Sequence, residues 1–179
     1  MIGIQGQVDF KRRDYNLVVE VSEKLKEGGI KNIKFNIIGT HNRETLRDIV
    51  SEKGLQSYFV FHESLDDRQF FEEVAKCDYL MPLLGEEQKS YYANKMTATY
   101  SHSAAYRIPM IIYSANAEAW GINHAQAVLY SDINSLFGVL KSLRDYADLQ
   151  VKYAQLIDEK VARNKQFLCD LSSSLGFRK

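Results

Sequence analysis

The chain has 179 residues, 45% of them hydrophobic and 26% charged, which predicts one globular domain with a full-sized core. Its 23 basic and 23 acidic side chains balance, and this zero net charge argues against a general nucleic-acid or membrane-surface binder. Because the sequence has no apolar run of membrane-spanning length, no visible signal peptide and only two distant cysteines, we expect a cytoplasmic, reducing environment.

Strand-like and helical segments alternate through the first half of the chain. Three segments rich in β-branched and aromatic residues are expected strands: 1–8, 33–38 and 58–62. Three segments with apolar side chains at helical spacing are expected helices: 15–26, 41–53 and 64–76. Ser64 is the expected N-cap of the third helix.

The sequence between residues 77 and 112 predicts a βαβ unit. A buried strand at 77–84 (CDYLMPLL) precedes a polar loop at 85–95, a helix at 96–107 and a second buried strand at 108–112 (IPMII). Ligands of open parallel sheets bind beyond the carboxyl ends of the strands. The loop at 85–95 is therefore a first candidate for a binding site.

The last third of the chain continues the same alternation. We expect a short helix or turn at 116–120, a weak strand at 127–130, and a helix to residue 146 that Ser131 or Asp132 caps. One long helix follows, with apolar residues at three- and four-residue steps. The predicted fold is therefore α/β: a Rossmann-like three-layer domain with a parallel sheet of about six strands and a long C-terminal helix.

Two glycine-containing stretches follow expected strand ends. Gly6 and the basic run Lys11, Arg12 and Arg13 combine cations with a helix N-terminus, which suits a phosphate group. Gly39 would let a ligand approach the backbone after the second strand. A solvated basic turn and an ordinary glycine turn are the alternative interpretations.

A third stretch lies between the central strand and its helix. Lys95, close to Glu87, Tyr92 and Thr97, could hold a diphosphate at the start of that helix. The alternative interpretation is a surface lysine on a polar helix turn.

Two histidines are further candidates. His62, next to Glu63, could take part in acid–base chemistry, although such pairs are more often hydrogen-bonded turns. His102 lies within the helix after Lys95 and either faces the core or contacts a ligand. No G-x-G-x-x-G, G-x-x-x-x-G-K-[ST] or G-x-S-x-G motif is present, which argues against a dinucleotide dehydrogenase, a P-loop ATPase and an α/β hydrolase.

The order of these segments resembles the C-terminal, donor-binding domain of retaining GT-B glycosyltransferases, which use nucleotide-diphospho-sugars. The resemblance rests on the glycine-ended first strand, the basic turn, the strand ending in IIG, and the segments YFVFH, CDYLMPLL and RIPMII. It covers residues 2–130, and the long last helix resembles the helix that closes this fold. The chain would then be one Rossmann-like domain, with an α/β core at 1–147 and the helix at 148–179.

The resemblance implies a function and partners. The domain would bind a nucleotide-sugar for transfer of a hexosyl group to a glycan or glycolipid, as in polysaccharide biosynthesis, with no cofactor and no metal. It would be the C-terminal half of a two-domain enzyme, inactive without an N-terminal acceptor domain. Nucleic acid is not an expected partner, while peripheral membrane association through the N-terminal domain and homo-oligomerisation stay open.

The resemblance also assigns individual residues. In that family an arginine and a lysine hold the donor diphosphate, and here Arg12 or Lys11 stands nearest. Gln7 occupies the position after the glycine where the family often has arginine. Residues 92–97 are similar to a Y-x-x-K-[ILM]-[ST] variant, which implies that Lys95 and Thr97 contact the diphosphate or the sugar.

The chain departs from the E-x7-E signature of that family. His102 replaces the second glutamate, Asn94 stands where the first would be, and Arg107 replaces a glycine. Catalytic residues are therefore not assigned. A non-catalytic α/β module is the alternative, either a degenerate donor domain or a flavodoxin- or receiver-like domain. A receiver domain would need an acidic pair after its first strand, where this chain is basic.

Overall fold

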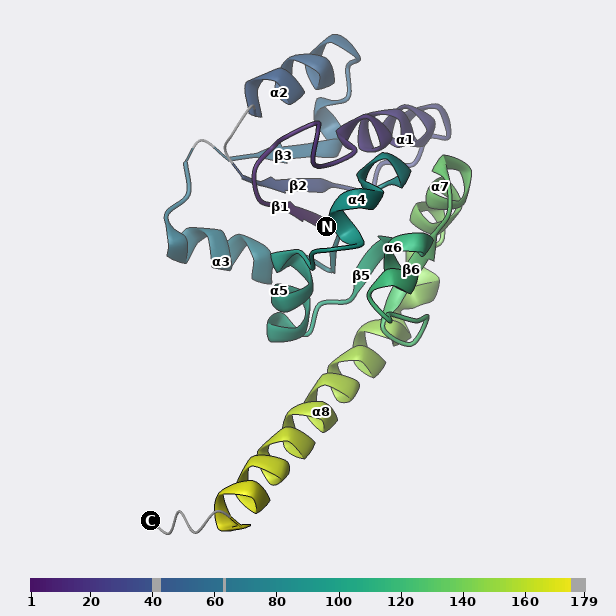
Figure 1. Cartoon of the computed structure of the whole chain (residues 1–179). Coiled ribbons are helices and arrows are strands. Elements are labelled where there is room, and N and C mark those ends of the chain that lie inside the picture. The colour runs from purple at the N-terminus through teal and green to yellow at the C-terminus, as the bar shows by residue number, and fades with distance from the viewer. Residues whose placement is uncertain (40–42, 63, 175–179) are drawn as a thin grey trace.

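A six-stranded, all-parallel sheet forms the centre of the protein in a computed structural model that describes residues 1–39, 43–62 and 64–174 (Figure 1). The strands are β1 (Ile2–Gln5), β2 (Phe35–Ile38), β3 (Phe59–Phe61), β4 (Tyr79–Leu80), β5 (Met110–Tyr113) and β6 (Ala127–Tyr130). Their order in the sheet is β3-β2-β1-β4-β5-β6, and every neighbouring pair is parallel. The direction of winding therefore reverses between β1 and β4.

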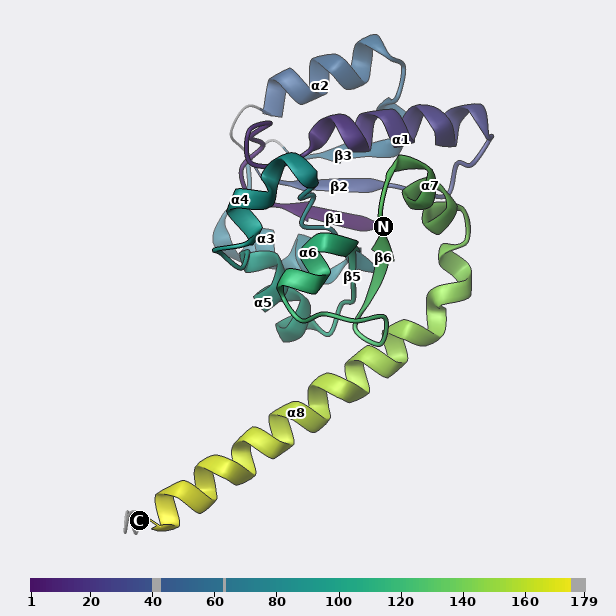
Figure 2. The same cartoon turned by 45° about the vertical axis from the view of Figure 1, so that its right-hand side comes forward.

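Helices cover both faces of this sheet (Figure 2). They are α1 (Tyr15–Glu27), α2 (Arg43–Glu52), α3 (Asp67–Ala75), α4 (Lys89–Tyr92), α5 (Ala98–Tyr106), α6 (Ser114–Ala119), α7 (Ile133–Lys141) and α8 (Ala147–Ser174). One hydrophobic cluster joins the sheet to α1, α2 and α7, and a second joins it to α3, α5 and α6. These two layers confirm the predicted Rossmann-like three-layer fold.

Aspartates begin three of the helices by accepting hydrogen bonds from the first backbone N–H groups. Asp14 caps α1, and Asp132 caps α7, as one of the two expected residues. The expectation that Ser64 caps α3 was wrong. Asp66 caps it through a reciprocal pair of bonds with Gln69, at 2.8 and 3.0 Å, which fixes the start of the helix two residues later.

Several segments differ from the expected boundaries, and the strand expected at 77–84 is confined to Tyr79–Leu80. The loop at 85–95 contains a 3₁₀ turn (Glu86–Gln88) and the short helix α4, and α5 begins at Ala98. The helix expected to reach residue 146 ends at Lys141, and Ser142 is its C-cap. A 3₁₀ turn (Leu143–Tyr146) then leads into α8.

The first part of α8 packs on the domain. Leu149 and Tyr153 are buried, and the Tyr153 hydroxyl lies 2.8 Å from that of Ser103 on α5. Beyond them the helix extends away from the sheet, and its side chains Phe167 and Leu168 are 64% and 60% exposed (Figure 1). Within the described ranges, no helix is both long and apolar enough to cross a membrane.

Candidate functional site

The loop after β1 turns sharply at Gly6 and is tied to the loop after β4. Gly6 has a φ of +97°, and its N–H donates to the carbonyl of Ile38 at 2.9 Å. A Cβ atom on Gly6 would lie 2.9 Å from the guanidinium of Arg13, which donates a hydrogen bond to the carbonyl of Pro82. Arg13 therefore joins the two strand ends between which the winding of the sheet reverses.

A cavity of about 310 Å³ lies at this reversal. Its lining residues are Gln7, Arg12, Arg13, Leu84 and Thr97. They come from the loop after β1, the loop after β4 and the start of α5. In open parallel sheets this crevice, beyond the carboxyl ends of the strands where the order reverses, is the usual ligand site.

The N-terminus of α5 differs from those of α1, α3 and α7. The side chain of its N-cap residue, Thr97, makes no capping hydrogen bond to the N–H groups of the first turn. The Thr97 side chain is only 6% exposed, and its Oγ1 has no hydrogen-bond partner among the residues that the structure describes. A buried hydroxyl and uncapped N–H groups at the positive end of a helix provide donors for an anion.

Two guanidinium groups add positive charge to the same cavity. The backbone N–H groups of Arg12 and Arg13 donate to the carbonyl of Asp9 at 3.0 and 2.9 Å, which fixes the basic turn. Arg12 Nε also lies 3.3 Å from Asp9 Oδ2, in an exposed ion pair that contributes little to stability. Because its head is largely in solvent, Arg12 can turn to a ligand at little cost. Arginines beside a helix N-terminus suit a diphosphate.

The backbone beside Leu84 is strained. Leu83 is buried and has a φ of +57°, in the left-handed region that non-glycine residues rarely adopt. Its carbonyl accepts a hydrogen bond from the N–H of Asp14 at 2.9 Å, and this bond ties the β4 loop to the start of α1. Strain of this kind gathers at ligand sites, where the surrounding structure holds it in place.

A second cavity of about 250 Å³ lies on the other side of the Gly6–Gln7 turn. Its lining residues are Gly6, Gln7, Ile38, Gly39, His62, Leu65, Asp67 and Phe70. Gln7 lines both cavities, so the two hollows adjoin at the loop after β1. The walls of the second cavity are mainly apolar, in contrast to the cationic first cavity.

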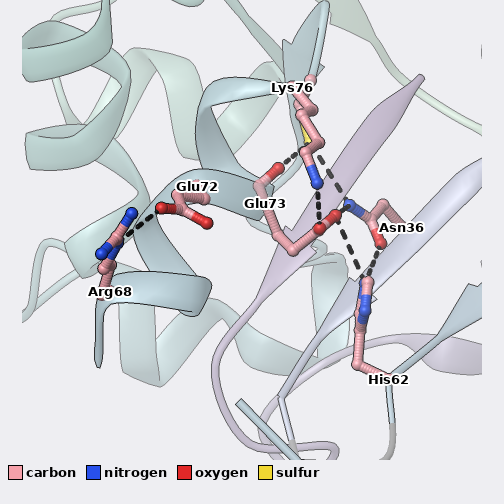
Figure 3. A network of polar contacts seen from close by, with 7 residues as sticks. Asn36, His62, Arg68, Glu72, Glu73 and Lys76 are labelled. Atoms are coloured by element: carbon pink, nitrogen blue, oxygen red, sulfur yellow. Dashed lines mark hydrogen bonds and ion pairs between the residues drawn. The ribbon is translucent and has the colours of Figure 1, made fainter. Parts of the chain in front are cut away.

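The ring of His62 contacts a polar network that includes Asn36 of the sheet and Glu73 of α3 (Figure 3). Its Nε2 lies 2.7 Å from Asn36 Oδ1 and 3.6 Å from Glu73 Oε2, and Asn36 Nδ2 donates to Glu73 Oε2 at 3.3 Å. A hydrogen bond from Lys76, and smaller contributions from Asn36 and His62, lower the pKa of Glu73. Glu73 is therefore a carboxylate at neutral pH.

His102 belongs to a different cluster. Its Nδ1 lies 2.9 Å from Gln5 Oε1, and its ring packs against those of Phe70 and Phe71, with centroids 6.0 and 5.5 Å away. Burial lowers the pKa of His102 below its usual value. His102 is not among the residues that line the two cavities, and its contacts correspond to the core-facing one of the two alternatives.

The two cavities bring together half of the candidate residues. Arg12 and Thr97 line the first, and Gly6, Gly39 and His62 line the second. Five candidates line neither: Lys11, Glu87, Tyr92, Lys95 and His102. Three of these five, Lys11, Glu87 and Lys95, are exposed. Tyr92 is buried, and its carbonyl accepts a hydrogen bond from Trp120 Nε1 at 3.0 Å.

Several lining residues were not among the candidates. Leu84 gives no chemical signal in the sequence, and Arg13 was noted in the basic run without being singled out. The network of Asn36 and Glu73 joins two elements that are far apart in sequence. Thr40, His41, Asn42 and Glu63, which neighbour the candidates, lie outside the described residues. Within the described part of the chain, no group of three or more histidine, cysteine or acidic side chains could hold a metal ion.

Comparisons with known proteins connect this arrangement to one fold family. No family model and no curated protein matches the sequence. Among solved structures, the C-terminal domain of the group 1 glycosyl transferase LpcC from Francisella tularensis superposes with a TM-score of 0.64 at 16% identity, covering 90% of this chain and 84% of that domain. This chain has the fold of a GT-B C-terminal domain.

Two larger solved structures share the same fold. A mutant of S. aureus TarM, in complex with Fondaparinux, alpha-GlcNAc-glycerol and UDP, superposes with a TM-score of 0.65 at 13% identity over 90% of this chain. Anabaena HepE in complex with UDP gives 0.65 at 11% identity over 96% of this chain. The GT-B-like chain spans 32% of TarM and 48% of HepE.

Proposed function

We propose that this GT-B-type domain binds the nucleoside diphosphate of a nucleotide-sugar in the cavity at the β1–β4 reversal. The observation that carries the proposal is the convergence of Arg12, Arg13 and the uncapped N-terminus of α5 on one cavity. A diphosphate would accept hydrogen bonds from the buried Thr97 hydroxyl and from the first N–H groups of α5, and its negative charge would lie beside Arg12 and Arg13. UDP is the first ligand to test, because the TarM and HepE structures contain it.

The proposed reaction is transfer of a hexosyl group from that donor to a glycan or glycolipid. Its leaving group is the nucleoside diphosphate, whose developing charge the arginines and the α5 dipole would stabilise, so we propose transfer without a metal ion. In a two-domain enzyme the acceptor and the base come from an N-terminal domain. We propose that the exposed distal half of α8 packs on that domain, and that the chain alone does not catalyse transfer.

Binding can be tested on the chain as it stands. Thermal-shift screening with UDP, GDP and ADP should give at least one stabilising nucleotide, and calorimetry with that nucleotide measures its affinity. Arg12→Gln should weaken binding, whereas Arg163→Gln, which removes an exposed arginine on α8, should leave it unchanged. Equal affinity of the two variants, or no stabilisation by any nucleotide, would contradict the proposed site.

A degenerate donor domain is the second candidate, and the position of His102 favours it. The second glutamate of the GT-B signature is replaced by a histidine that bonds Gln5 and packs against Phe70 and Phe71. Assays of the chain joined to an N-terminal GT-B domain, with UDP-hexoses as donors, distinguish the two candidates. Nucleotide binding without transfer or donor hydrolysis would establish the degenerate domain, and sugar transfer would establish the enzyme.

A further inference from the structure

The polar network behind His62 determines which of its ring nitrogens carries a proton. Asn36 is 0% exposed, and its amide lies between the carboxylate of Glu73 and the ring of His62. A carboxylate can only accept hydrogen bonds, so the Asn36 Nδ2 group must face Glu73. The amide oxygen then faces His62 Nε2 at 2.7 Å. Since that oxygen can only accept, Nε2 must be the protonated nitrogen.

The same constraint leaves the second nitrogen of His62 as an acceptor. In a neutral imidazole with a proton on Nε2, Nδ1 has a free lone pair. Nδ1 has no hydrogen-bond partner in the described part of the chain, while His62 lines the second cavity. His62 can therefore offer the cavity an acceptor whose chemistry is set by residues outside it. Its apolar walls, which include Ile38, Leu65 and Phe70, suit a flat ring.

We propose that His62 is a specificity-determining residue that reads the base of the bound nucleotide. Nδ1 accepts a hydrogen bond from a base N–H, and Asn36 and Glu73 act as positioning residues that fix this tautomer. The inference rests on the proposed function. If the diphosphate occupies the first cavity, the nucleoside would extend past Gln7, which lines both cavities, into the second cavity. In UDP the group that His62 would read is N3–H, the only N–H of uracil.

The tautomer can be measured without any ligand. Nitrogen-15 NMR of the histidine side chains at pH 8 should show His62 with a protonated Nε2 and an unprotonated Nδ1. Glu73→Gln should weaken this preference, because either atom of the new amide can face Asn36. A proton on Nδ1 in the wild-type protein overturns the proposal.

Calorimetry then tests recognition of the base. The wild-type protein should bind 3-methyl-UDP about three- to tenfold more weakly than UDP, the loss expected for one hydrogen bond. His62→Leu should weaken UDP binding by a similar factor, abolish the difference between UDP and 3-methyl-UDP, and leave the affinity for inorganic pyrophosphate unchanged. His124→Leu, at an exposed histidine elsewhere, is the matched control and should behave as wild type.

The outcomes separate this inference from the proposed function. Equal affinities of the wild-type protein for UDP and 3-methyl-UDP overturn the role of His62, and this comparison needs no variant that must fold. If the protein binds pyrophosphate but does not bind UDP, base recognition by His62 is overturned and the proposed anion site still stands. If neither UDP nor pyrophosphate binds, both the proposed function and the inference fail.

Discussion

The carbonyl group of Gly6 fills the space that a side chain on Gly39 would need. A Cβ atom on Gly39 would lie 2.7 Å from the Gly6 carbonyl carbon and closer still to its oxygen. The loops after β1 and β2 are therefore in direct backbone contact, and this contact shapes the second cavity. The packing of these loops therefore requires glycine at both positions, whatever the ligand is.

Gly39→Ala should destabilise the protein because one of the two loops must move. We expect a loss of about 1–3 kcal/mol in the free energy of unfolding, measured by urea denaturation. Gly138→Ala, in α7 where a Cβ atom meets nothing within 4 Å, is the matched control. It should raise stability by about 0.5–1 kcal/mol, because glycine within a helix is unfavourable relative to alanine. Unchanged stability of Gly39→Ala would show that the loops do not touch.

Thr97→Val should separate binding from stability. The Thr97 hydroxyl has no hydrogen-bond partner among the described residues, so removing it should leave the free energy of unfolding unchanged or slightly raised. UDP binding, measured by calorimetry, should weaken about three- to tenfold through loss of one hydrogen bond. Thr99→Val removes a similarly buried hydroxyl that does not line the cavity and should not change affinity. Equal UDP affinities of the two variants would exclude Thr97 from the site.

Lys95 stays a prediction of the sequence, because it is exposed and does not line the first cavity. It lies two residues before Thr97, and its long side chain could reach a diphosphate at the α5 N-terminus. Lys95→Ala should then weaken nucleotide binding by about ten- to a hundredfold, with little change in stability. Arg12→Ala should act in the same direction. Wild-type affinity of Lys95→Ala would leave this lysine as part of a solvated turn.

Stability should fall as pH decreases through the usual histidine pKa of 6.5, because of His102. Burial lowers the pKa of His102 in the folded state, so below pH 6.5 the unfolded chain binds more protons than the folded one. The contribution of neutral His102 to the free energy of unfolding is therefore complete above its pKa in the unfolded chain, and it decreases as the pH falls below that value. The lowered pKa values of Glu73 and Asp132 act at lower pH, since their usual values are 4.5 and 3.8. Urea unfolding of His102→Gln should show a smaller pH dependence, and an unchanged slope would contradict this assignment.

The distal half of α8 should promote self-association of the isolated domain. Val161, Phe167 and Leu168 are large exposed apolar side chains on a helix that extends from the body. Phe167→Ser together with Leu168→Ser should reduce association in sedimentation velocity without lowering the free energy of unfolding. A wild-type domain that is monomeric at high concentration would contradict this expectation.

Local patterns were sufficient to predict the sheet. The apolar runs that contain Phe35, Phe59 and Met110 occupy buried strands, because alternation and β-branched content report burial directly. Helix ends were less predictable. Ser64 and Asp66 are both good caps, and only the reach of Gln69 to Asp66 decides between them.

The candidate site was predictable where it depends on strand ends and not where it depends on tertiary contacts. The sequence places three residues at the carboxyl edge of the sheet, because each follows or precedes a regular element: Gly6, Arg12 and Thr97. The position of Arg13 depends on its contact with Pro82, which lies 69 residues away. The network of Asn36 and Glu73 exists only because α3 packs across β2, and no periodicity in the sequence reports that contact.

A crystal structure of the domain with UDP would be the most direct test of the proposed site. The diphosphate should lie in the first cavity, within hydrogen-bond distance of Thr97 Oγ1 and the guanidinium of Arg12 or Arg13. The uracil should lie in the second cavity with its N3–H directed at His62 Nδ1. UDP bound elsewhere on the protein, with the cavity between Arg12 and Thr97 containing only water, would contradict the account.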